Sequence, residues 1–271
     1  MGEVQIVMHA FGGISIVNAI PSWFGGALAV NLKVYAKIKP CKDVCKHISH
    51  LTEAIVNYFI KKYSLNPFEI EITSEIPPQS GLKSSSAVAV AAIKTVVEEY
   101  NIDELSIPKL AAELSLQAGV SITGALDDAA ASYYGGAVLT DNLNMKILRV
   151  FEPKVDAVVV IAAKGYRKTK VDTEVMRRHS HIFYDIFVKA LEGNIFEAMK
   201  LNGLAIARIL GYDDKLLRIA IERGALAAGI SGNGPSAFVV SRKGDEYYFV
   251  DLVKEYSEDI RVVEVVGLGR V

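Results

Sequence analysis

A loop rich in glycine and serine runs directly into a stretch of small apolar residues, and this junction constrains the fold more than any other feature. The segment reads Pro77-Pro-Gln-Ser-Gly-Leu-Lys-Ser-Ser-Ser-Ala-Val-Ala-Val-Ala-Ala-Ile93. It predicts a loop that opens a helix running to about Tyr100. A helix N-terminus presents unpaired N–H groups and about half a positive charge, so we expect an anion-binding site here.

The side chains of this loop suit a phosphate group. Gly81 lets the backbone turn tightly and approach an anion closely. Ser84, Ser85 and Ser86 add hydroxyls for phosphate oxygens or Mg²⁺, and Lys83 adds a mobile positive charge. A serine-capped helix after a turn accounts equally well for the loop taken alone. Neither Gly-x-x-x-x-Gly-Lys-Ser/Thr nor Gly-x-Gly-x-x-Gly occurs, so a nucleotide bound here would need a different kind of loop.

A second glycine-rich segment, Gly229-Ile-Ser-Gly-Asn-Gly-Pro-Ser236, lies far along the chain. Its three glycines and Pro235 predict a rigid turn with exposed amides, able to line the same phosphate site or the substrate. Taken alone, it would be interpreted as a turn that leads into the strand predicted at 237–241.

Two adjacent acids, Asp127 and Asp128, interrupt a segment of small residues, Thr123-Gly-Ala-Leu-Asp-Asp-Ala-Ala-Ala-Ser-Tyr-Tyr-Gly-Gly136. Burying carboxylates in such a helix is costly unless they have a function. A carboxylate here could orient a substrate hydroxyl, accept its proton or hold Mg²⁺. The alternative is a solvent-facing helical turn, which the surrounding alanine, tyrosine and glycine disfavour.

The composition excludes several classes of protein. The 271 residues carry 30 basic and 31 acidic side chains, so no basic stripe for nucleic acid is predicted. Hydrophobic residues make up 51%, which excludes disorder, yet no uncharged apolar run approaches the roughly 18 residues of a membrane helix. No export signal is visible and two cysteines make no disulfide framework, so a cytoplasmic protein without a membrane partner is expected.

Hydrophobic periodicity predicts helices and strands in a mixed order. Helices are predicted over 43–62, 84–100, 108–118, 124–134, 173–192, 195–210, 213–226 and 247–256. Strands are predicted over 5–9, 27–39, 68–73, 137–140, 157–163, 237–241 and 261–266. A composition shift at 142–153 marks the predicted boundary between two domains, 1–150 and 151–271.

The three motifs, in this order, resemble those of the GHMP kinases, the superfamily of galactokinase, homoserine kinase and mevalonate kinase. The family's phosphate loop has the form Pro-x-x-x-Gly-Leu-Gly-Ser-Ser-Ala, which residues 77–86 match except at Lys83 and Ser86. The resemblance implies an α+β fold with a ribosomal-protein-S5-like domain followed by a ferredoxin-like α/β domain. It also implies ATP and Mg²⁺ as cofactors, with Ser85 on the metal. The nucleotide-binding residues it implies are Pro78, Gln79, Ser80, Gly81, Leu82, Lys83, Ser84, Ser85, Ser86, Ala87, Gly232, Asn233 and Gly234.

Within this superfamily the details most resemble the archaeal-type shikimate kinases. They share the loop at 79–86, the segment at 123–129 and the early Gly12-Gly-x-x-x-x-Asn18-Ala-Ile-Pro. The resemblance implies transfer of the γ-phosphoryl group of ATP to the 3-hydroxyl of shikimate. We expect Asp128 and Asp127 as catalytic acids from this resemblance, and Lys83, where the loop departs from the family, as a catalytic cation near the transferring group. The expected substrate residues are Gly12, Asn18, Asp127, Arg167 and Ser231. A homoserine or mevalonate kinase, or a non-catalytic binding protein with this fold, is the alternative.

The chain departs from the family's pattern near the acids. A glutamate about ten residues before the catalytic acid commonly helps to hold Mg²⁺, but Gln117 occupies that spacing here and Glu113 lies one turn earlier. Counting from Gly124 makes Asp127 the catalytic acid, whereas counting back from Gly135 makes it Asp128, which we favour.

Two other clusters carry possible ligands. Residues 164–170 offer four cations for a substrate carboxylate, with Arg167 as the best bidentate partner, although a solvated run of charge accounts for them equally well. Cys41, Cys45, His47 and His50 have the spacing of a zinc site. A helix over 43–62 would spread them across different faces, so no metal is predicted there.

Overall fold

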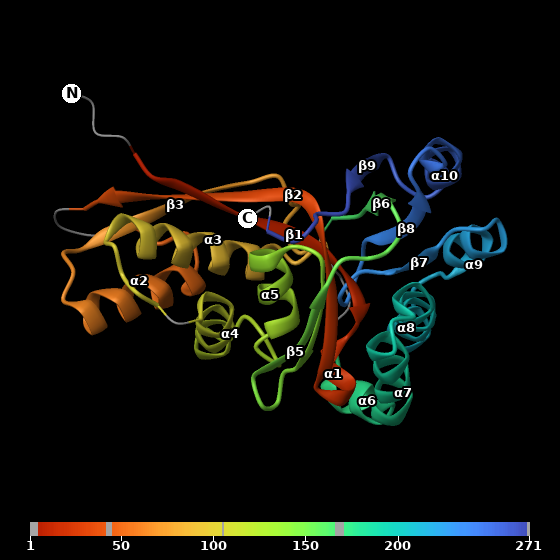
Figure 1. Cartoon of the computed structure of the whole chain (residues 1–271), viewed down its shortest axis with the longest axis horizontal. Helices are drawn as coiled ribbons and strands as arrows, with labels where there is room; N and C mark the ends of the chain where they lie inside the picture. Colours follow the sequence, from red (N-terminus) through yellow and green to blue (C-terminus); the bar gives the residue numbers. More distant parts are fainter. Residues whose placement is uncertain (1–4, 42–44, 105, 166–170, 270–271) are drawn as a thin grey trace.

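The computed structural model describes residues 5–41, 45–104, 106–165 and 171–269, and it has two antiparallel sheets with helices packed against them (Figure 1). The first sheet contains β1 (Val7–Val17), β2 (Phe24–Pro40), β3 (Phe68–Ser74), β4 (Ala137–Asp141) and β5 (Lys146–Phe151). The second contains β6 (Ala157–Ala163), β7 (Ala227–Ile230), β8 (Ala237–Arg242) and β9 (Asp259–Glu264). The helices are α1 (Ala19–Ser22), α2 (His50–Tyr63), α3 (Ser84–Glu99), α4 (Ile107–Gln117), α5 (Leu126–Tyr134), α6 (Thr173–Arg177), α7 (Ser180–Leu191), α8 (Ile195–Leu210), α9 (Lys215–Glu222) and α10 (Glu246–Val253).

The first sheet has the order β1-β2-β4-β5, with β3 also paired to the long strand β2. Helices α2, α3 and α4 lie along one side of β1, β2 and β3 (Figure 1). Helix α3 lies closest to the sheet because its buried face is made of small side chains, Ala87, Ala89, Ala91 and Ala92, all fully buried. This close packing fixes the N-terminus of α3 against β1.

The second sheet has the order β7-β8-β6-β9, and α8, α9 and α10 pack on it. Helix α8 approaches β7 so closely that a Cβ on Gly203 would lie 2.3 Å from the Cα of Gly229. The same helix contacts β1, and Val30 of β2 bridges to Val265, so one hydrophobic core joins both halves. The chain passes from one sheet to the other between β5 and β6, and we propose the domain boundary there, as predicted at 150.

Most predicted elements are present, but several differ. The helix predicted over 173–192 is divided into α6 and α7, and the strand predicted over 5–9 runs from Val7 to Val17. Strand β6 has the predicted bounds, but β5 and β7 were not predicted, because β5 is largely exposed and β7 has only 4 residues. The helix predicted from residue 43 begins at His50, so the prediction is wrong for 45–49. Ser49 starts the helix because its hydroxyl accepts the Thr52 N–H, while Thr52 accepts the Ser49 N–H.

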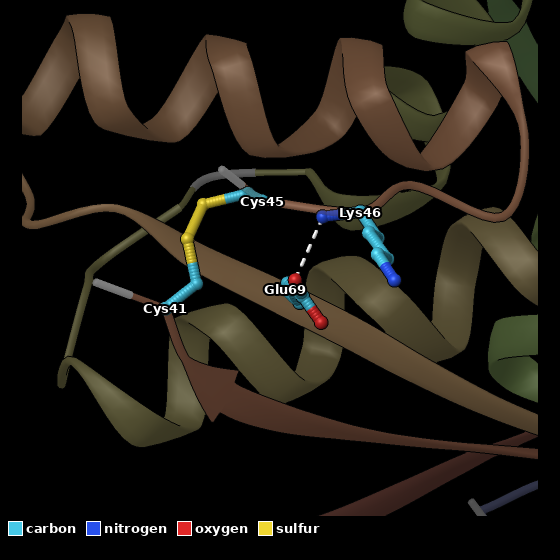
Figure 2. Close-up of a disulfide and its surroundings, with 4 residues drawn as sticks. All are labelled: Cys41, Cys45, Lys46 and Glu69. Atoms are coloured by element: carbon cyan, nitrogen blue, oxygen red, sulfur yellow. Dashed lines mark hydrogen bonds between the residues drawn. A yellow bond between two sulfur atoms is a disulfide. The ribbon is translucent and has the colours of Figure 1, made fainter. Parts of the chain in front are cut away.

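The two cysteines, Cys41 and Cys45, are joined in a disulfide between the end of β2 and the segment leading to α2 (Figure 2). Beside it, the Lys46 N–H donates to the Glu69 carboxylate at 2.7 Å. Over the described part of the chain, no three His, Cys, Asp or Glu side chains are placed to share a metal ion. No helix within the same part is long and apolar enough to cross a membrane.

Candidate active site

A cavity of about 560 Å³ lies where the N-termini of α3 and α5 meet the second glycine-rich loop. It brings together three segments that are far apart in sequence, as the motifs predicted. Its described lining residues are Asn18, Ala19, Ile20, Gln79, Ser80, Gly81, Lys83, Ser84, Ser85, Ser86, Ser115, Val120, Ser121, Ile122, Thr123, Ala125, Asp127, Asp128, Val171, Gly232 and Asn233.

The first glycine-rich loop places the open end of α3 at the cavity. Gly81 has a φ of +86°, and a Cβ there would lie 2.2 Å from the Ser231 carbonyl oxygen, so only glycine fits. Lys83 precedes the helix in a left-handed conformation, with a φ of +66°, and no side chain caps this end. The first-turn amides therefore remain available to an anion.

Lys83 carries its charge from this loop to Asp128. Its stem passes over Gly13, where a Cβ would lie 3.4 Å from the Lys83 Cγ. The Nζ lies 2.9 Å from Asp128 Oδ1 and donates to the Ser15 hydroxyl at 2.8 Å. Both charged side chains are largely buried, at 9% and 14% exposed. An ammonium has three N–H groups and only one is used in the hydrogen bond to Ser15, so Lys83 can also donate to an oxygen of a bound ligand.

The second glycine-rich loop is bonded to the first. The Ser231 hydroxyl donates to the Gly81 carbonyl at 2.8 Å, and the Ser236 N–H donates to the Ser80 carbonyl at 3.2 Å. A Cβ on Gly234 would lie 2.6 Å from the Tyr212 ring. The two loops therefore form one continuous wall of backbone around the cavity.

Asn18 holds this loop from β1 and α1. Its side-chain amide donates to the Gly232 carbonyl at 3.1 Å and to Asn233 Oδ1 at 2.9 Å. Its Oδ1 accepts the Ile20 N–H and caps α1. Both polar ends of Asn18 are thus bonded within the protein, at the edge of the cavity.

Asp127 is held differently from its neighbour. It is only 3% exposed, accepts a hydrogen bond from the Asn142 side chain at 3.2 Å, and packs against Gly25. Asn142 itself is fixed because its Oδ1 accepts the Leu126 N–H at 2.7 Å. Burial, and then the charge of Asp128, raise the pKa of Asp127 to about 7. Asp127 is thus uncharged for part of the time near neutral pH.

The predicted residues fall into three groups. Lining the cavity are Asn18, Gln79, Ser80, Gly81, Lys83, Ser84, Ser85, Ser86, Asp127, Asp128, Gly232 and Asn233. Behind or beside it are Gly12, Pro78, Leu82, Ala87, Ser231 and Gly234. Arg167 lies outside the described residues. Glu113 and Gln117, considered for Mg²⁺, are exposed and do not line the cavity.

The sequence did not reveal the wall formed between α4 and α5. Ser115, Ser121 and Thr123 contribute hydroxyls to the cavity, while Val120 and Ile122 stay 43% and 41% exposed beside it. The alternation of polar and apolar residues over 120–123 was the available signal.

Comparison with known proteins places this site in a family. The GHMP kinases N terminal domain model matches residues 50–136, which include the first loop and both acids. A protein of Methanothermobacter thermautotrophicus named shikimate kinase is 32% identical, over 99% of this chain and 98% of its own length. The chain belongs to the GHMP kinase family.

Other relatives and solved structures agree with this assignment. The shikimate kinase of Pyrococcus abyssi is 36% identical to this GHMP kinase, over 88% of the chain and 92% of its own length. The crystal structure of Methanococcus jannaschii mevalonate kinase matches with a TM-score of 0.75 at 16% identity, covering 98% of this chain and 99% of the other. A homoserine kinase structure from Cytophaga hutchinsonii gives a TM-score of 0.70 at 18% identity, covering 99% and 98%. The predicted α+β GHMP fold is confirmed.

Proposed function

We propose that this GHMP kinase transfers the γ-phosphoryl group of ATP to the 3-hydroxyl of shikimate. The observation that carries a kinase assignment is the Lys83–Asp128 pair, 2.9 Å apart beside the open N-terminus of α3. The choice of shikimate is supported by relatives of that name, which align with nearly the whole chain. The pair also argues against a non-catalytic binding protein, which would need no buried acid facing a lysine.

Asp128 is the acid we assign to the acceptor hydroxyl. In phosphoryl transfer the protein mainly positions the reactants and stabilises charge. The Asp128 carboxylate lines the cavity and would orient that hydroxyl and accept its proton. Lys83 would direct an N–H towards an oxygen of the transferring group, where negative charge is spread in the transition state.

ATP and Mg²⁺ fit the donors that the cavity offers. The amides of the first turn of α3 and of Asn233 suit phosphate oxygens, since the Gly232 N–H already donates to the Ser15 hydroxyl. The hydroxyls of Ser84, Ser85 and Ser86 are hard oxygen donors, and Mg²⁺ is commonly held by few protein oxygens together with phosphates and water. We propose Ser85 as the protein ligand; the ion would neutralise phosphate charge when bound.

The carboxylate of shikimate needs a cation in addition to the one among the described residues that line the cavity. Among the described lining residues the one cation is Lys83, which is already paired with Asp128. Residues 164–170 follow β6, and Lys164 at their start is bonded to Ser236 through its backbone. We therefore keep Arg167 as the proposed carboxylate ligand, with Asn18 and the second loop positioned beside the substrate.

Coupled assays of ADP release test this function. The purified chain is incubated with ATP–Mg²⁺ and, separately, shikimate, homoserine or mevalonate, and the product is identified by mass spectrometry. We expect turnover on shikimate, with 3-phosphoshikimate as the product. An Asp128→Asn variant purified in the same way controls for contaminating kinases. Turnover on another acceptor but not on shikimate would contradict the substrate, and ATP binding without any turnover would favour a binding protein.

A further inference from the structure

Ser15, a residue that no motif singled out, lies at the junction of the two glycine-rich loops. It is fully buried in β1, where the pairing with β2 shifts register between Ser15 and Val17. Such irregularities redirect side chains, and they are common beside active sites. The Ser15 hydroxyl is thereby placed beside Lys83 of the first loop and Gly232 of the second.

The hydroxyl oxygen of Ser15 receives two hydrogen bonds at once. Lys83 Nζ donates to it at 2.8 Å, and the Gly232 N–H donates to it at 2.9 Å. A serine oxygen has two acceptor lone pairs, so both are used. Lys83 Nζ in turn contacts Asp128 at 2.9 Å. A single buried atom therefore joins the ammonium, the second loop and, through Lys83, the acid.

The hydrogen bond from Lys83 to Ser15 matters because the lysine side chain is long and flexible. A four-carbon stem has considerable rotational freedom, and a phosphate in the cavity would compete with Asp128 for the ammonium. The hydrogen bond to Ser15 and the ion pair with Asp128 together restrict the position of the ammonium. The backbone of Lys83 is left-handed, with a φ of +66°, a strained conformation of the kind often found at functional sites.

We propose that Ser15 is a positioning residue for phosphoryl transfer: its hydroxyl holds Lys83 against Asp128 and ties this pair to the loop at Gly232. This role rests on the proposed kinase function. In this role Ser15, which lies on β1, acts on the reaction through Lys83 and does not itself contact the substrate.

A double-mutant cycle on kcat tests the role, because two residues that act through one another do not have additive effects. Ser15→Ala removes the acceptor, and Ser15→Cys keeps nearly the same volume with a weaker acceptor. Each is made in the wild-type chain and in Lys83→Met. Ser241→Ala is the matched control, because Ser241 is also a buried strand serine, 1% exposed, whose hydroxyl has no partner among the described residues.

We expect both Ser15 variants to lower kcat about tenfold in the wild-type chain and less than about twofold in Lys83→Met. Ser241→Ala should leave kcat unchanged. Equal losses in the two backgrounds would indicate a merely structural role and overturn the proposal, as would a loss below about threefold in the wild-type chain. If Ser15→Ala fails to fold, Ser15→Cys decides alone by the same criteria.

Calorimetric titration with a non-hydrolysable ATP analogue separates this proposal from the proposed function. We expect the analogue's Kd to change less than about threefold in Ser15→Ala, because Lys83 and its charge remain in the cavity and only the position of the ammonium changes. If the wild-type chain turns over homoserine instead of shikimate, the substrate is wrong and the cycle is measured on homoserine. If the wild-type chain has no kinase activity, or if Ser15→Ala lowers analogue affinity as much as kcat falls, the positioning role is overturned.

Discussion

Two polar clusters lie on either side of the first turn of α5. Each contains one carboxylate, and the two carboxylates have different surroundings. The reactive cluster is Asp128 with Lys83 and Ser15, and the buried cluster is Asp127 with Asn142 and Gly25. Successive residues of a helix point about 100° apart, so adjacent acids reach different environments. Both acids line the cavity, but Asp128 faces a cation, whereas Asp127 is nearly fully buried and faces an amide and a glycine.

The comparison shows how two neighbouring acids can have separate tasks. Burial and the proximity of Asp128 raise the pKa of Asp127 to about 7, so Asp127 does not compete as a full charge for Lys83. The hydrogen bonds of Asn142 instead fix the start of α5, since it also accepts the Leu126 N–H. Asn142 therefore joins Asp127 to the first turn of α5, the helix that carries Asp128.

Apart from removing Asp128 itself, the largest expected effect comes from removing the cation of the reactive cluster. Lys83→Gly eliminates the ammonium and relieves the strain of a φ of +66°. We expect kcat to fall about 10²- to 10³-fold, while the relieved strain offsets part of the stability lost with the buried ion pair. Steady-state kinetics and calorimetric melting measure both. Substantial activity in this variant would show that Lys83 is not part of the reactive cluster.

Filling the space beside the buried cluster should cost stability. In Gly25→Ala the new Cβ would lie 2.7 Å from Asp127 Oδ2 and from Asn142 Nδ2. We expect the free energy of unfolding to fall by about 1–3 kcal/mol, as overpacking does in cores. Urea denaturation measures this, with Gly165→Ala as the control, since a Cβ on Gly165 would meet no described atom within 4 Å. An unchanged urea midpoint in Gly25→Ala would mean that the cluster is loosely packed.

The buried acid predicts a pH dependence of stability. Because the pKa of Asp127 is raised in the folded chain, the folded state binds more protons than the unfolded state between about pH 4 and pH 7. The contribution of Asp127 to the free energy of unfolding is therefore complete below about pH 4, and it is lost as the pH rises to about 7. In Asp127→Asn this loss disappears, so the variant should gain stability relative to wild type from pH 4 to pH 7. Parallel curves in urea denaturation would contradict the pKa shift.

The smallest expected effect is a small steric change beside the reactive cluster. In Gly13→Ala the Cβ would lie 3.4 Å from Lys83 Cγ and 3.0 Å from the Leu28 carbonyl oxygen. The lysine stem can shift slightly, so we expect kcat to fall about threefold, with little change in stability. A fall as large as that of Lys83→Gly would show that the path of Lys83 over Gly13 is more restrictive than this geometry indicates.

The motifs of the candidate site can be recognised in the sequence because each is local. A helix N-terminus with Gly81 and Lys83 signals an anion site in one short segment, and the structure places both residues at the cavity. The tasks of Asp127 and Asp128 could not be separated from sequence, since they depend on Asn142 and Gly25, which other strands bring to α5. Ser15 was missed for the same reason: a serine within a strand carries no local signal.

The elements of the fold show the same limit. Strand β6 is continuously apolar and was predicted with its observed bounds, whereas the short β7 is recognisable only from its pairing with β8. The start of α2 was placed too early because the apolar spacing continues to Ile48, which is 64% exposed. There the capping of Ser49 and Thr52, rather than hydrophobic spacing, sets where the helix begins.

The most direct test of the account compares Asp128→Asn with Asp127→Asn in one assay of shikimate phosphorylation. Asparagine keeps the shape of each side chain and removes only its ability to ionise. We predict that Asp128→Asn lowers kcat about 10³-fold with ATP affinity nearly unchanged, and that Asp127→Asn stays within about tenfold of wild type. A loss in Asp127→Asn equal to or greater than that in Asp128→Asn would contradict the assignment of the reactive cluster.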